Sequence, residues 1–454
     1  MSMTKIRRIH NFQHSFTFSS QTEDFDAFYA RFLESDLGKV YIAVPWDDLA
    51  GSFGLGESKK GPLSIFSAKG KLALMFLKHY GCCSDRRLME QLNGNLDWQF
   101  FCGIYLGPER LGNFKMISEI RCELAGKLDM DKVQQAFYGH WSPHMQDKGC
   151  ITMDATCYES HLRYPTNIKL LWEAVDWLHG LIKDICKERG VPVPRSKYLK
   201  WKKRYVSYSK MRRKTNKKKR ALTRSLLLLL EKFNGEVDRL EALHAVAMTE
   251  DQYRRRGTAK KVFAQQHNYF HKGEKPKDRI VSMDRPYIRP IVRGKEIKPV
   301  EFGAKANKFQ IDGISFVEHL SFDAFHEGNR FQNTVFKAQR LTKTRTKLAG
   351  ADAIYATNKN RSFATKYDIR TDFKRKGRAG KHEKQRGKLA AAITKERASR
   401  LEGSFGKDKE HYHLKRIRAR TKETEILWIF FGIHTGNALE IGRRMSAMAL
   451  EKAA

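Results

Sequence analysis

The order of strand-like and helical patterns constrains the fold of this chain more than any other feature of its sequence. Residues 149–157 alternate and are rich in β-branched side chains, which predicts a strand. The pattern from Pro165 to about Lys275 is helical, and strand-like runs return over Tyr287–Phe322. Strands separated in this way predict a mixed α/β core, with residues 165–280 as a helical insertion after the first core strand.

The second half of the chain continues the same alternation. Asp312-Gly313 lies between two apolar runs and predicts a hairpin turn. A helical stretch over Asn329–Leu341 is followed by Leu348–Ala351, a short run of small and apolar residues that predicts a buried strand ending at Asp352. Residues 387–400 are helical again, and Glu402 lies just beyond the densest part of that pattern.

The first 145 residues are predicted to form a separate helical domain, with residues 146–454 as the second domain. Thr22–Leu33 has helical spacing, and Gly38–Pro45 is an extended run. Two further helices are expected over Leu63–Tyr80 and Ser84–Leu92, joined by a turn at Gly81. This pair could be a helix-turn-helix that binds DNA, and an ordinary helical hairpin fits the same pattern.

The charge of the chain points to a polyanionic partner. Its 454 residues include 87 Lys and Arg against 50 Asp and Glu, a formal net charge of +37. Such an excess repels itself on folding and is usually carried to bind a polyanion. Nucleic acid is the leading candidate, ahead of an anionic membrane surface or a merely soluble basic protein.

Membrane insertion and disulfide chemistry are not expected. The most apolar C-terminal stretch, Ile426–Ile433, is far shorter than the roughly 20 residues that cross a bilayer. The N-terminus lacks the apolar core of a secretory signal. Seven cysteines all precede residue 190 without CxxC spacing, which predicts buried reduced thiols in a cytosolic protein and no zinc site.

One segment concentrates positive charge. Lys200–Arg220 contains twelve Lys and Arg residues, among them Arg212 and Arg213, and no acidic residue. Charges this dense need a polyanion or remain in solvent. Trp201, Tyr205 and Tyr208 lie among them and could stack on unpaired bases, whereas a solvated basic loop accounts equally well for the free protein.

Three acidic residues lie where metal ligands would be expected. Cleavage of a phosphodiester by water needs an activated nucleophile and charge relief at the leaving oxygen, which two Mg²⁺ ions can supply. Such ions prefer oxygen ligands from several chain segments. Asp154 and Asp352 each follow an apolar run, and Glu402 has a helical context. An acidic residue at the end of a strand is more often a turn former or a helix cap, and composition alone does not distinguish these three.

Four blocks of sequence carry a resemblance to a known family. They are SAKGKLALMFLKHYGCCSDRRLMEQLNGNLDWQFFCGI at 67–104, ITMDATCYESHLRYPTNIKLLWEA at 151–174, GADAIYATNKNRSF at 350–363 and RLEGSFGKDKEHYHLKRIRAR at 400–420. The chain resembles the bacterial insertion-sequence transposases with an Asp-Asp-Glu triad on a ribonuclease-H-like fold. The resemblance implies that Asp154, Asp352 and Glu402 are the catalytic triad and hold two Mg²⁺ or Mn²⁺ ions.

The resemblance also implies a function and partners. Such an enzyme cleaves the ends of its mobile element and joins their 3′-hydroxyls to target DNA. Its partners would be double-stranded DNA, as terminal inverted repeats and as target, and a second copy of the chain on that DNA. No membrane partner is implied, and the expected location is the bacterial cytoplasm, in association with the nucleoid.

Some DNA-contacting positions of the family are matched here and others are not. Lys409 matches a lysine seven positions after the glutamate, but the family's tyrosine and arginine positions hold Lys395 and Ala398. Arg397 and Arg400 lie close by and could substitute. Lys374, Arg375 and Lys376 lie between Asp352 and Glu402 and are expected near the scissile phosphate. His161 could approach the metals, although a buried structural histidine is the preferred interpretation.

Two other classes of function remain open. A metal-dependent DNA nuclease would share the acidic residues but would not join DNA ends. A non-catalytic DNA-binding protein would carry the same positive charge without needing an acidic triad, so Asp154→Ala would leave its function intact.

Overall fold

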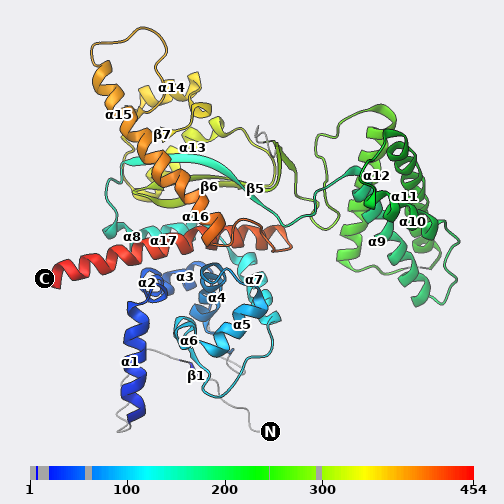
Figure 1. Ribbon diagram of the computed structural model, residues 1–454, viewed down its shortest axis with the longest axis horizontal. Helices are drawn as coiled ribbons and strands as arrows, with labels where there is room; N and C mark the ends of the chain where they lie inside the picture. Colours follow the sequence, from blue (N-terminus) through cyan, green and yellow to red (C-terminus); the bar gives the residue numbers. More distant parts are fainter. Residues whose placement is uncertain (1–6, 9–19, 57–63, 245, 293–298, 454) are drawn as a thin grey trace. The chain divides into compact units, whose positions relative to one another are not determined.

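The structure is a computed structural model that describes residues 7–8, 20–56, 64–244, 246–292 and 299–453, and it divides into two compact units (Figure 1). The first unit comprises residues 1–160, 304–321 and 325–454, and the second comprises residues 161–303 and 322–324. The first contains helices and a mixed sheet, whereas the second is mainly helical. The predicted mixed α/β class is therefore confirmed.

The N-terminal part of the first unit is built from short helices. They are α1 (Ser20–Glu34), α2 (Asp36–Ala43), α3 (Trp46–Ser52), α4 (Ala68–Tyr80), α5 (Asp85–Gly94), α6 (Leu96–Cys102), α7 (Lys115–Lys127), α8 (Met130–Trp141) and η1 (Ser142–His144), with the short strands β1 (Arg7–Arg8) and β2 (Ile104–Tyr105). Ser84 caps α5 by accepting a hydrogen bond from the Arg87 amide, as its sequence context suggests.

The predicted helical pair is present with different limits, and one predicted element is wrong. α4 begins at Ala68, where Ser67 caps it, and Leu63 lies outside the described residues. The run Gly38–Pro45 was expected to be extended, but most of it belongs to α2. Ser35 caps this helix by accepting from the Gly38 amide, and Leu37, Val40 and Ala43 turn one face into the core. The cap and the helical spacing outweigh the β-propensity of the run.

The sheet has the strand order β4–β5–β3–β7–β8, with β6 paired to β5 outside that path. Its strands are β3 (Cys150–Glu159), β4 (Pro290–Val292), β5 (Val300–Ile311), β6 (Ile314–Ser321), β7 (Leu348–Ala351) and β8 (Arg370–Thr371). β3, β7 and β8 run parallel, and β5 and β6 form an antiparallel hairpin. The predicted turn at Asp312-Gly313 is confirmed, and both residues have positive φ.

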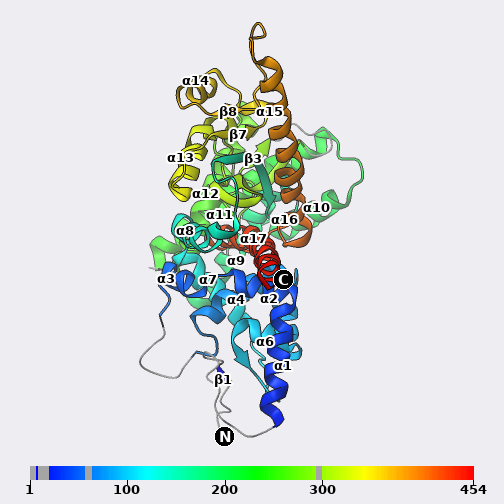
Figure 2. The same ribbon diagram turned by 90° about the vertical axis from the view of Figure 1, so that its left-hand side faces the viewer.

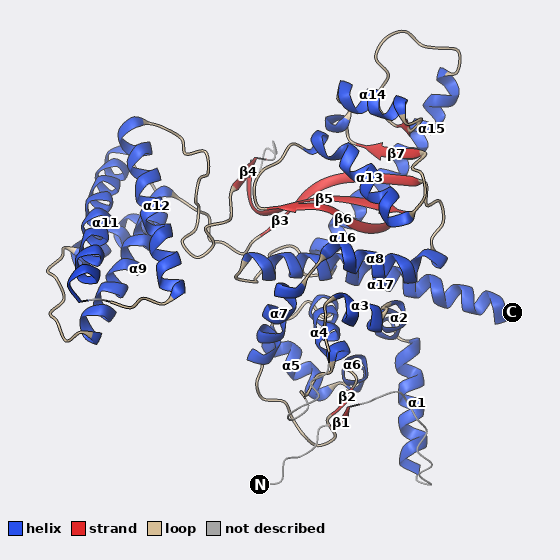
Figure 3. Cartoon of the chain, turned by 180° about the vertical axis from the view of Figure 1, so that it is seen from behind, coloured by secondary structure: helices blue, strands red, loops and turns tan. Residues whose placement is uncertain are grey.

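Helices cover both faces of this sheet (Figures 1 and 3). One face packs against α13 (Phe331–Thr342), whose Phe331 and Val335 share a core with Ile151 and Met153 of β3. The other face carries α15 (Glu383–Glu396), a π-helical turn η4 (Arg397–Glu402) and α16 (Gly403–His411). The connections contain η2 (Glu327–Arg330), η3 (Ala353–Tyr355) and α14 (Asn358–Lys366).

The last helix, α17 (Lys422–Ala453), joins the N-terminal helices to the sheet (Figure 2). It packs against α2, α4 and α7 on one side and against β6 on the other. Residues 427–433 are nearly all buried, which explains the apolar stretch near the C-terminus. Within the described ranges, no helix is both long enough and apolar enough to cross a membrane.

The second unit has its own core, formed by α9 (Asn167–Glu188), α10 (Tyr198–Lys210), α11 (Asn216–His244) and α12 (Glu250–Lys272). The basic segment Lys200–Arg220 was expected to be a loop or an extended chain, but α10 and α11 include most of it. Trp201, Tyr205 and Tyr208 pack against this core, and the Tyr205 ring stacks on Trp172 at 4.9 Å. All three rings are half-buried, so each uses part of its surface in packing.

The cysteines differ from expectation in their burial. All seven are free thiols, but only Cys102, Cys157 and Cys186 are buried, and Cys82 and Cys122 are exposed. The exposed pair lies in the turn after α4 and on the outer face of α7, where an apolar side chain is not required by the core. The prediction of buried thiols is wrong for these two.

Gly442 makes the crossing of α17 over α2 possible, and its substitution should destabilise the protein. A Cβ atom at this position would collide with the backbone carbonyl of Lys39. We expect Gly442→Ala to lower the free energy of unfolding by about 1–3 kcal/mol, because α2 must move away from α17. Gly139→Ala in α8 is the matched control, since a Cβ there meets nothing within 4 Å. Denaturant melts with equal midpoints for the two variants would contradict this account.

Candidate active site

Asp154 and Asp352 occupy adjacent positions on neighbouring parallel strands. The register of β3 and β7 pairs Met153 with Ala351, and each aspartate is the next residue of its chain. Neighbouring strands lie about 4.8 Å apart, so the two carboxylates are neighbours. Asp352 follows the last residue of β7 as predicted. The strand predicted over residues 149–157 is present as β3, which continues to Glu159, so Asp154 lies within the strand and not at its end.

Both aspartates face the helices α15 and α16. Alternation along β3 places Thr152, Asp154 and Thr156 on one face, and Asp352 shares the face of Gly350 on β7. A Cβ at Gly350 would lie 2.5 Å from Cγ2 of Ile393 in α15 and 3.3 Å from Cγ2 of Thr152. The missing side chain at Gly350 therefore lets α15 lie directly on the strands that carry the acids.

Asp154 sits in an environment that disfavours its charge. Burial raises the pKa of Asp154 to about 6, and the Ala155 amide, which donates to its carboxylate at 2.7 Å, opposes that shift. The carboxylates of Glu327 and Asp352 raise the pKa further, while the Arg397 guanidinium lowers it. A buried carboxylate with two acidic neighbours is a site that a cation would stabilise.

Glu402 is the last residue of the π-helical turn η4, so the predicted helix continues through it with altered hydrogen bonding. Residues five apart lie on one side of a π turn. Arg397 Nη1 accordingly lies 2.9 Å from Glu402 Oε1, and Arg397 Nε lies 3.8 Å from Asp372 Oδ2. One guanidinium thus links Glu402 to Asp372 and acts on the charge of Asp154.

Two contacts attach α16 to β3 beside these acids. Lys409 Nζ donates to Thr156 Oγ1 at 3.0 Å. The Tyr158 hydroxyl donates to Asp408 Oδ2 at 2.7 Å. Lys409, predicted to grip DNA, is therefore half-buried and bound to the strand in this structure.

The other predicted DNA-contacting residues are mostly exposed. Arg400 Nη1 lies 3.0 Å from Asp312 and 3.1 Å from Glu396. Arg375 pairs with Glu383, and Lys376 donates to Asn358. Lys374 in the first unit and Arg212 and Arg213 in the second are also exposed. His161 was expected to be buried or near the metals, but it is an exposed residue of the second unit, at the end of β3 where the chain leaves the sheet.

Within the described part of the chain, no three His, Cys, Asp or Glu side chains form a group that would hold a metal ion. The structure brings Asp154 and Asp352 together and places Glu402 on a helix packed over the same strands, with its carboxylate bound to Arg397. The donor chemistry of the three residues still fits a hard divalent cation, because each offers carboxylate oxygens.

Comparison with known proteins decides the family. Residues 350–432, which include Asp352 and Glu402, match the family model described as Transposase DDE domain. Residues 34–123, which include α2 to α6, match the model described as Transposase domain (DUF772). The chain is an insertion-sequence DDE transposase. No curated protein and no solved structure matches it. DNA transposition, DNA binding and the use of a divalent metal ion follow from this membership.

Sequence reasoning missed two acids near the transposase site. Asp372 directly follows β8, and its carboxylate accepts from the Ala351 amide at 3.1 Å. β8 has only two residues, too few to show a strand pattern. Glu327 pairs with Lys305 at 2.8 Å, and its charge affects Asp154 more strongly than that of Asp352 does. No local pattern marks Glu327, because its place depends on how η2 packs.

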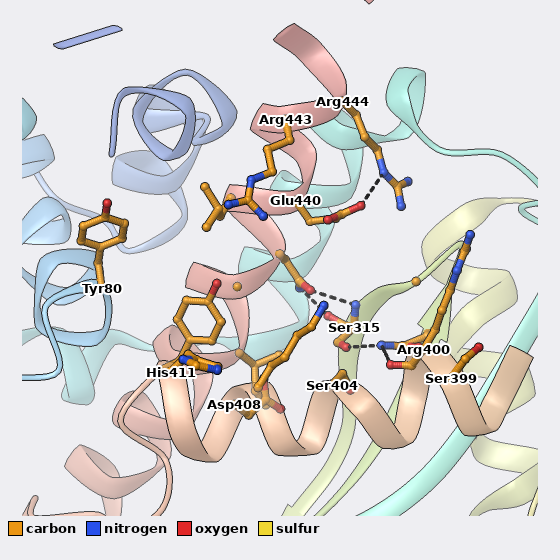
Figure 4. Close-up of a pocket in the computed structure, with 18 residues that line it drawn as sticks. Tyr80, Ser315, Ser399, Arg400, Ser404, Asp408, His411, Glu440, Arg443 and Arg444 are labelled. Carbon is orange, nitrogen blue, oxygen red and sulfur yellow. Dashed lines mark hydrogen bonds and ion pairs between the residues drawn. The ribbon is translucent and has the colours of Figure 1, made fainter. Parts of the chain in front are cut away.

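A cavity of about 620 Å³ lies between α16 and α17 of the transposase (Figure 4). Its lining includes Asp408 and three arginines that are already paired with carboxylates. Arg400 and Arg444 bind Asp312 at 3.0 and 2.7 Å, and Arg443 binds Asp36 at 2.9 Å. Each of these arginines therefore already has a carboxylate partner in the fold.

The raised pKa of Asp154 gives a pH dependence of stability that can be tested without activity. The folded protein holds this proton up to about pH 6, whereas the unfolded chain releases it near the ordinary value of 3.8. Stability should therefore fall as pH rises through this window in the absence of metal. Because asparagine does not ionise, Asp154→Asn should avoid this loss. At pH 8 we expect the free energy of unfolding of the variant to gain about 1–3 kcal/mol relative to wild type, and below pH 4 we expect almost no gain from this source. Urea melts of both proteins at the two pH values measure it, and a constant difference would contradict the shift.

Proposed function

We propose that this transposase cleaves the ends of its mobile element and joins their 3′-hydroxyls to target DNA by two-metal phosphoryl transfer. Asp154, Asp352 and Glu402 are the proposed catalytic residues and metal ligands. The adjacent register of Asp154 and Asp352 on parallel strands carries the proposal. The packing of η4, the π turn that ends at Glu402, against β3 adds support.

The proposed cofactor is a pair of Mg²⁺ or Mn²⁺ ions. Asp154 is half-buried and Asp352 is exposed, and their charges repel each other; a divalent cation would relieve that repulsion. Bound ions of this kind activate water and stabilise the charge on the leaving oxygen. Arg397 carries the positive charge beside these carboxylates here, and it would have to leave Glu402 if that residue held a metal ion.

The architecture supports a ribonuclease-H-like catalytic core. Three parallel strands, β3, β7 and β8, each lead to or contain an acid at the same part of the sheet, and helices cover both faces. We propose a functional division into an N-terminal DNA-binding domain over residues 1–145 and a catalytic domain over residues 146–454. Residues 165–280 are the proposed basic insertion.

The proposed DNA contacts come from exposed and partly exposed cations around the acids and from the insertion. In the first unit they are Lys374, Arg375, Lys376, Arg397, Arg400 and Lys409, and in the second they are Arg212 and Arg213. Such contacts bind phosphates and position DNA without reading its sequence. The terminal inverted repeats and the target duplex are the proposed partners.

We further propose a homodimer on DNA, because two ends must be joined in one reaction. The mass of the assembled complex on paired end fragments measures this directly. A mass equal to one protein chain on two ends would refute the dimer.

The experiment that tests the function is a plasmid assay with Mg²⁺ and the element's own ends. Wild-type protein should nick supercoiled plasmid at those ends and then join the 3′-ends to a second DNA. Cleavage without joining would favour the alternative, a metal-dependent nuclease. Binding without cleavage would favour a non-catalytic DNA-binding protein.

A further inference from the structure

A fully buried ionic cluster lies beneath α16, outside the proposed triad. Lys308 of β5 and Tyr158 of β3 have no exposed surface, and Asp408 of α16 is 5% exposed. Lys308 Nζ lies 2.6 Å from Asp408 Oδ2, and the Tyr158 hydroxyl donates to the same oxygen at 2.7 Å. The Lys308 ammonium also lies 4.6 Å from the centre of the Phe405 ring. Three elements are therefore held together at one carboxylate.

The cluster connects the two elements that carry the proposed catalytic residues. Tyr158 follows Asp154 by four residues on β3, a distance of about 13 Å along a strand. Asp408 follows Glu402 by six residues, a distance of about 9 Å along a helix. Lys409 adds a second contact to β3 through Thr156, between Tyr158 and Asp154. The helix is thus attached to the strand at two successive residues of the face that Asp154 occupies.

A buried ion pair restricts the position of a helix more than apolar packing does. Apolar side chains tolerate small shifts of a helix along a sheet, whereas a buried carboxylate that leaves its partners loses hydrogen bonds it cannot replace. Burying charged groups costs desolvation free energy, and buried ion pairs often add little net stability. Their presence here therefore indicates that they fix the position of α16. On its other side Asp408 lines the cavity between α16 and α17, where its polar neighbours include Gln310, Lys407 and His411.

We propose that Lys308, Asp408 and Tyr158 form a clamp that sets the register of the Glu402 helix on the Asp154 strand. They are positioning residues, because none of them is a proposed metal ligand. The inference rests on the proposed function for its catalytic consequence. Its structural part, the register of α16 on β3, is independent of that function.

The primary test uses Tyr158→Phe and Asp408→Asn in the full chain. Glu410→Gln, an exposed residue of the same helix paired only with Lys415, is the matched control. We expect the two clamp variants to need about 10-fold more Mg²⁺ for half-maximal nicking, because Glu402 would be less precisely placed over Asp154; loss of groups that orient metal ligands typically lowers metal affinity by about 10- to 100-fold. Affinity for end DNA, measured in Ca²⁺, should stay within about twofold, because the basic surface is unchanged.

Amide hydrogen exchange supplies a readout that needs neither metal nor catalysis. Residues 403–411 should exchange at least about 10-fold faster in the clamp variants, since α16 loses its buried attachment. Exchange in α9 of the second unit should not change. The clamp would be overturned if residues 403–411 of the variants exchanged at the wild-type rate. It would also be overturned if the variants needed the wild-type concentration of Mg²⁺ and lost nicking only in proportion to the fraction of protein that is unfolded.

The double variant Lys308→Met with Asp408→Leu guards against a folding defect, because apolar pairs often replace buried ion pairs without loss of stability. A folded double variant that still needs more Mg²⁺ supports the clamp, and one with the wild-type requirement overturns it. If wild type itself neither nicks nor joins DNA, the proposed function fails. The exchange measurement then still decides whether the cluster sets the register of α16.

Discussion

Asp154→Asn should reduce both end cleavage and strand transfer by about 10³-fold or more while leaving DNA binding intact. The substitution keeps the size of the side chain and removes the charge that would bind metal. Among the residues that the structure describes, the half-buried Asp154 carboxylate accepts from the Ala155 amide and forms no ion pair, so the fold should survive. Initial rates of nicking and joining on supercoiled plasmid, with binding measured separately, provide the comparison.

Asp352→Asn and Glu402→Gln should give losses of the same order, because the three acids are proposed to act as one unit. Asp47→Asn is the matched control, since its carboxylate is 87% exposed on α3 and forms an ion pair with Lys69. Wild-type rates in all three acid variants would show that the triad assignment is wrong. A loss confined to the two aspartates would instead direct attention from Glu402 to Glu327 or Asp372, the other acids near Asp154 and Arg397.

The elements that the sequence predicts best are those whose pattern is local. The strand before Asp352 and the hairpin at Asp312-Gly313 depend on short runs of residues, and the structure contains both. The family resemblance is confirmed. That resemblance, and no local pattern, singles out Asp154, Asp352 and Glu402 as the proposed triad among the 50 acidic residues. The adjacency of Asp154 and Asp352 needs the register of β3 and β7, which are almost 200 residues apart, and no local pattern specifies it.

Other features depend on tertiary contacts and escaped prediction. Gly38–Pro45 has the composition of a strand, yet it is mostly helical because Ser35 caps α2 and α17 covers its apolar side. The π turn at Arg397–Glu402 needs the burial of Leu401 and the pairing of Arg397 with Glu402. This turn also explains how an arginine five positions before the glutamate reaches it, although the family's arginine position, four before, holds Ala398.

Neutralising the exposed cations of residues 212–220, in the connection between α10 and α11 and the first turns of α11, should weaken DNA binding strongly and with a characteristic salt dependence. Residues 212–214 and 217–220 are all exposed, and the described structure shows no ion pair to any of them. Unpaired cations at this density repel one another, so contact with phosphates would relieve them. Charge near the proposed active site is different, because Arg375, Arg397 and Arg400 each already bind a carboxylate.

The test replaces Arg212, Arg213, Lys217 and Lys218 by Gln. Each lost phosphate contact should reduce the slope of log affinity against log salt by about 0.9, so four should reduce it by about 3.6. We expect affinity near 0.1 M salt to fall by about 10²–10³-fold, measured by fluorescence anisotropy on end DNA between 50 and 300 mM KCl.

Arg239→Gln with Arg254→Gln is the control in the same unit, because Glu236 and Asp251 already compensate these charges. The slope of log affinity against log salt for this control should differ from that of wild type by less than about 0.9, the value of one phosphate contact. If the fourfold variant also keeps the wild-type slope, the insertion does not contact the DNA backbone, and the positive charge of the first unit must carry DNA binding. A reduced slope with unchanged nicking at saturating DNA would assign the insertion to binding alone and leave the chemistry to the acids on β3, β7 and η4.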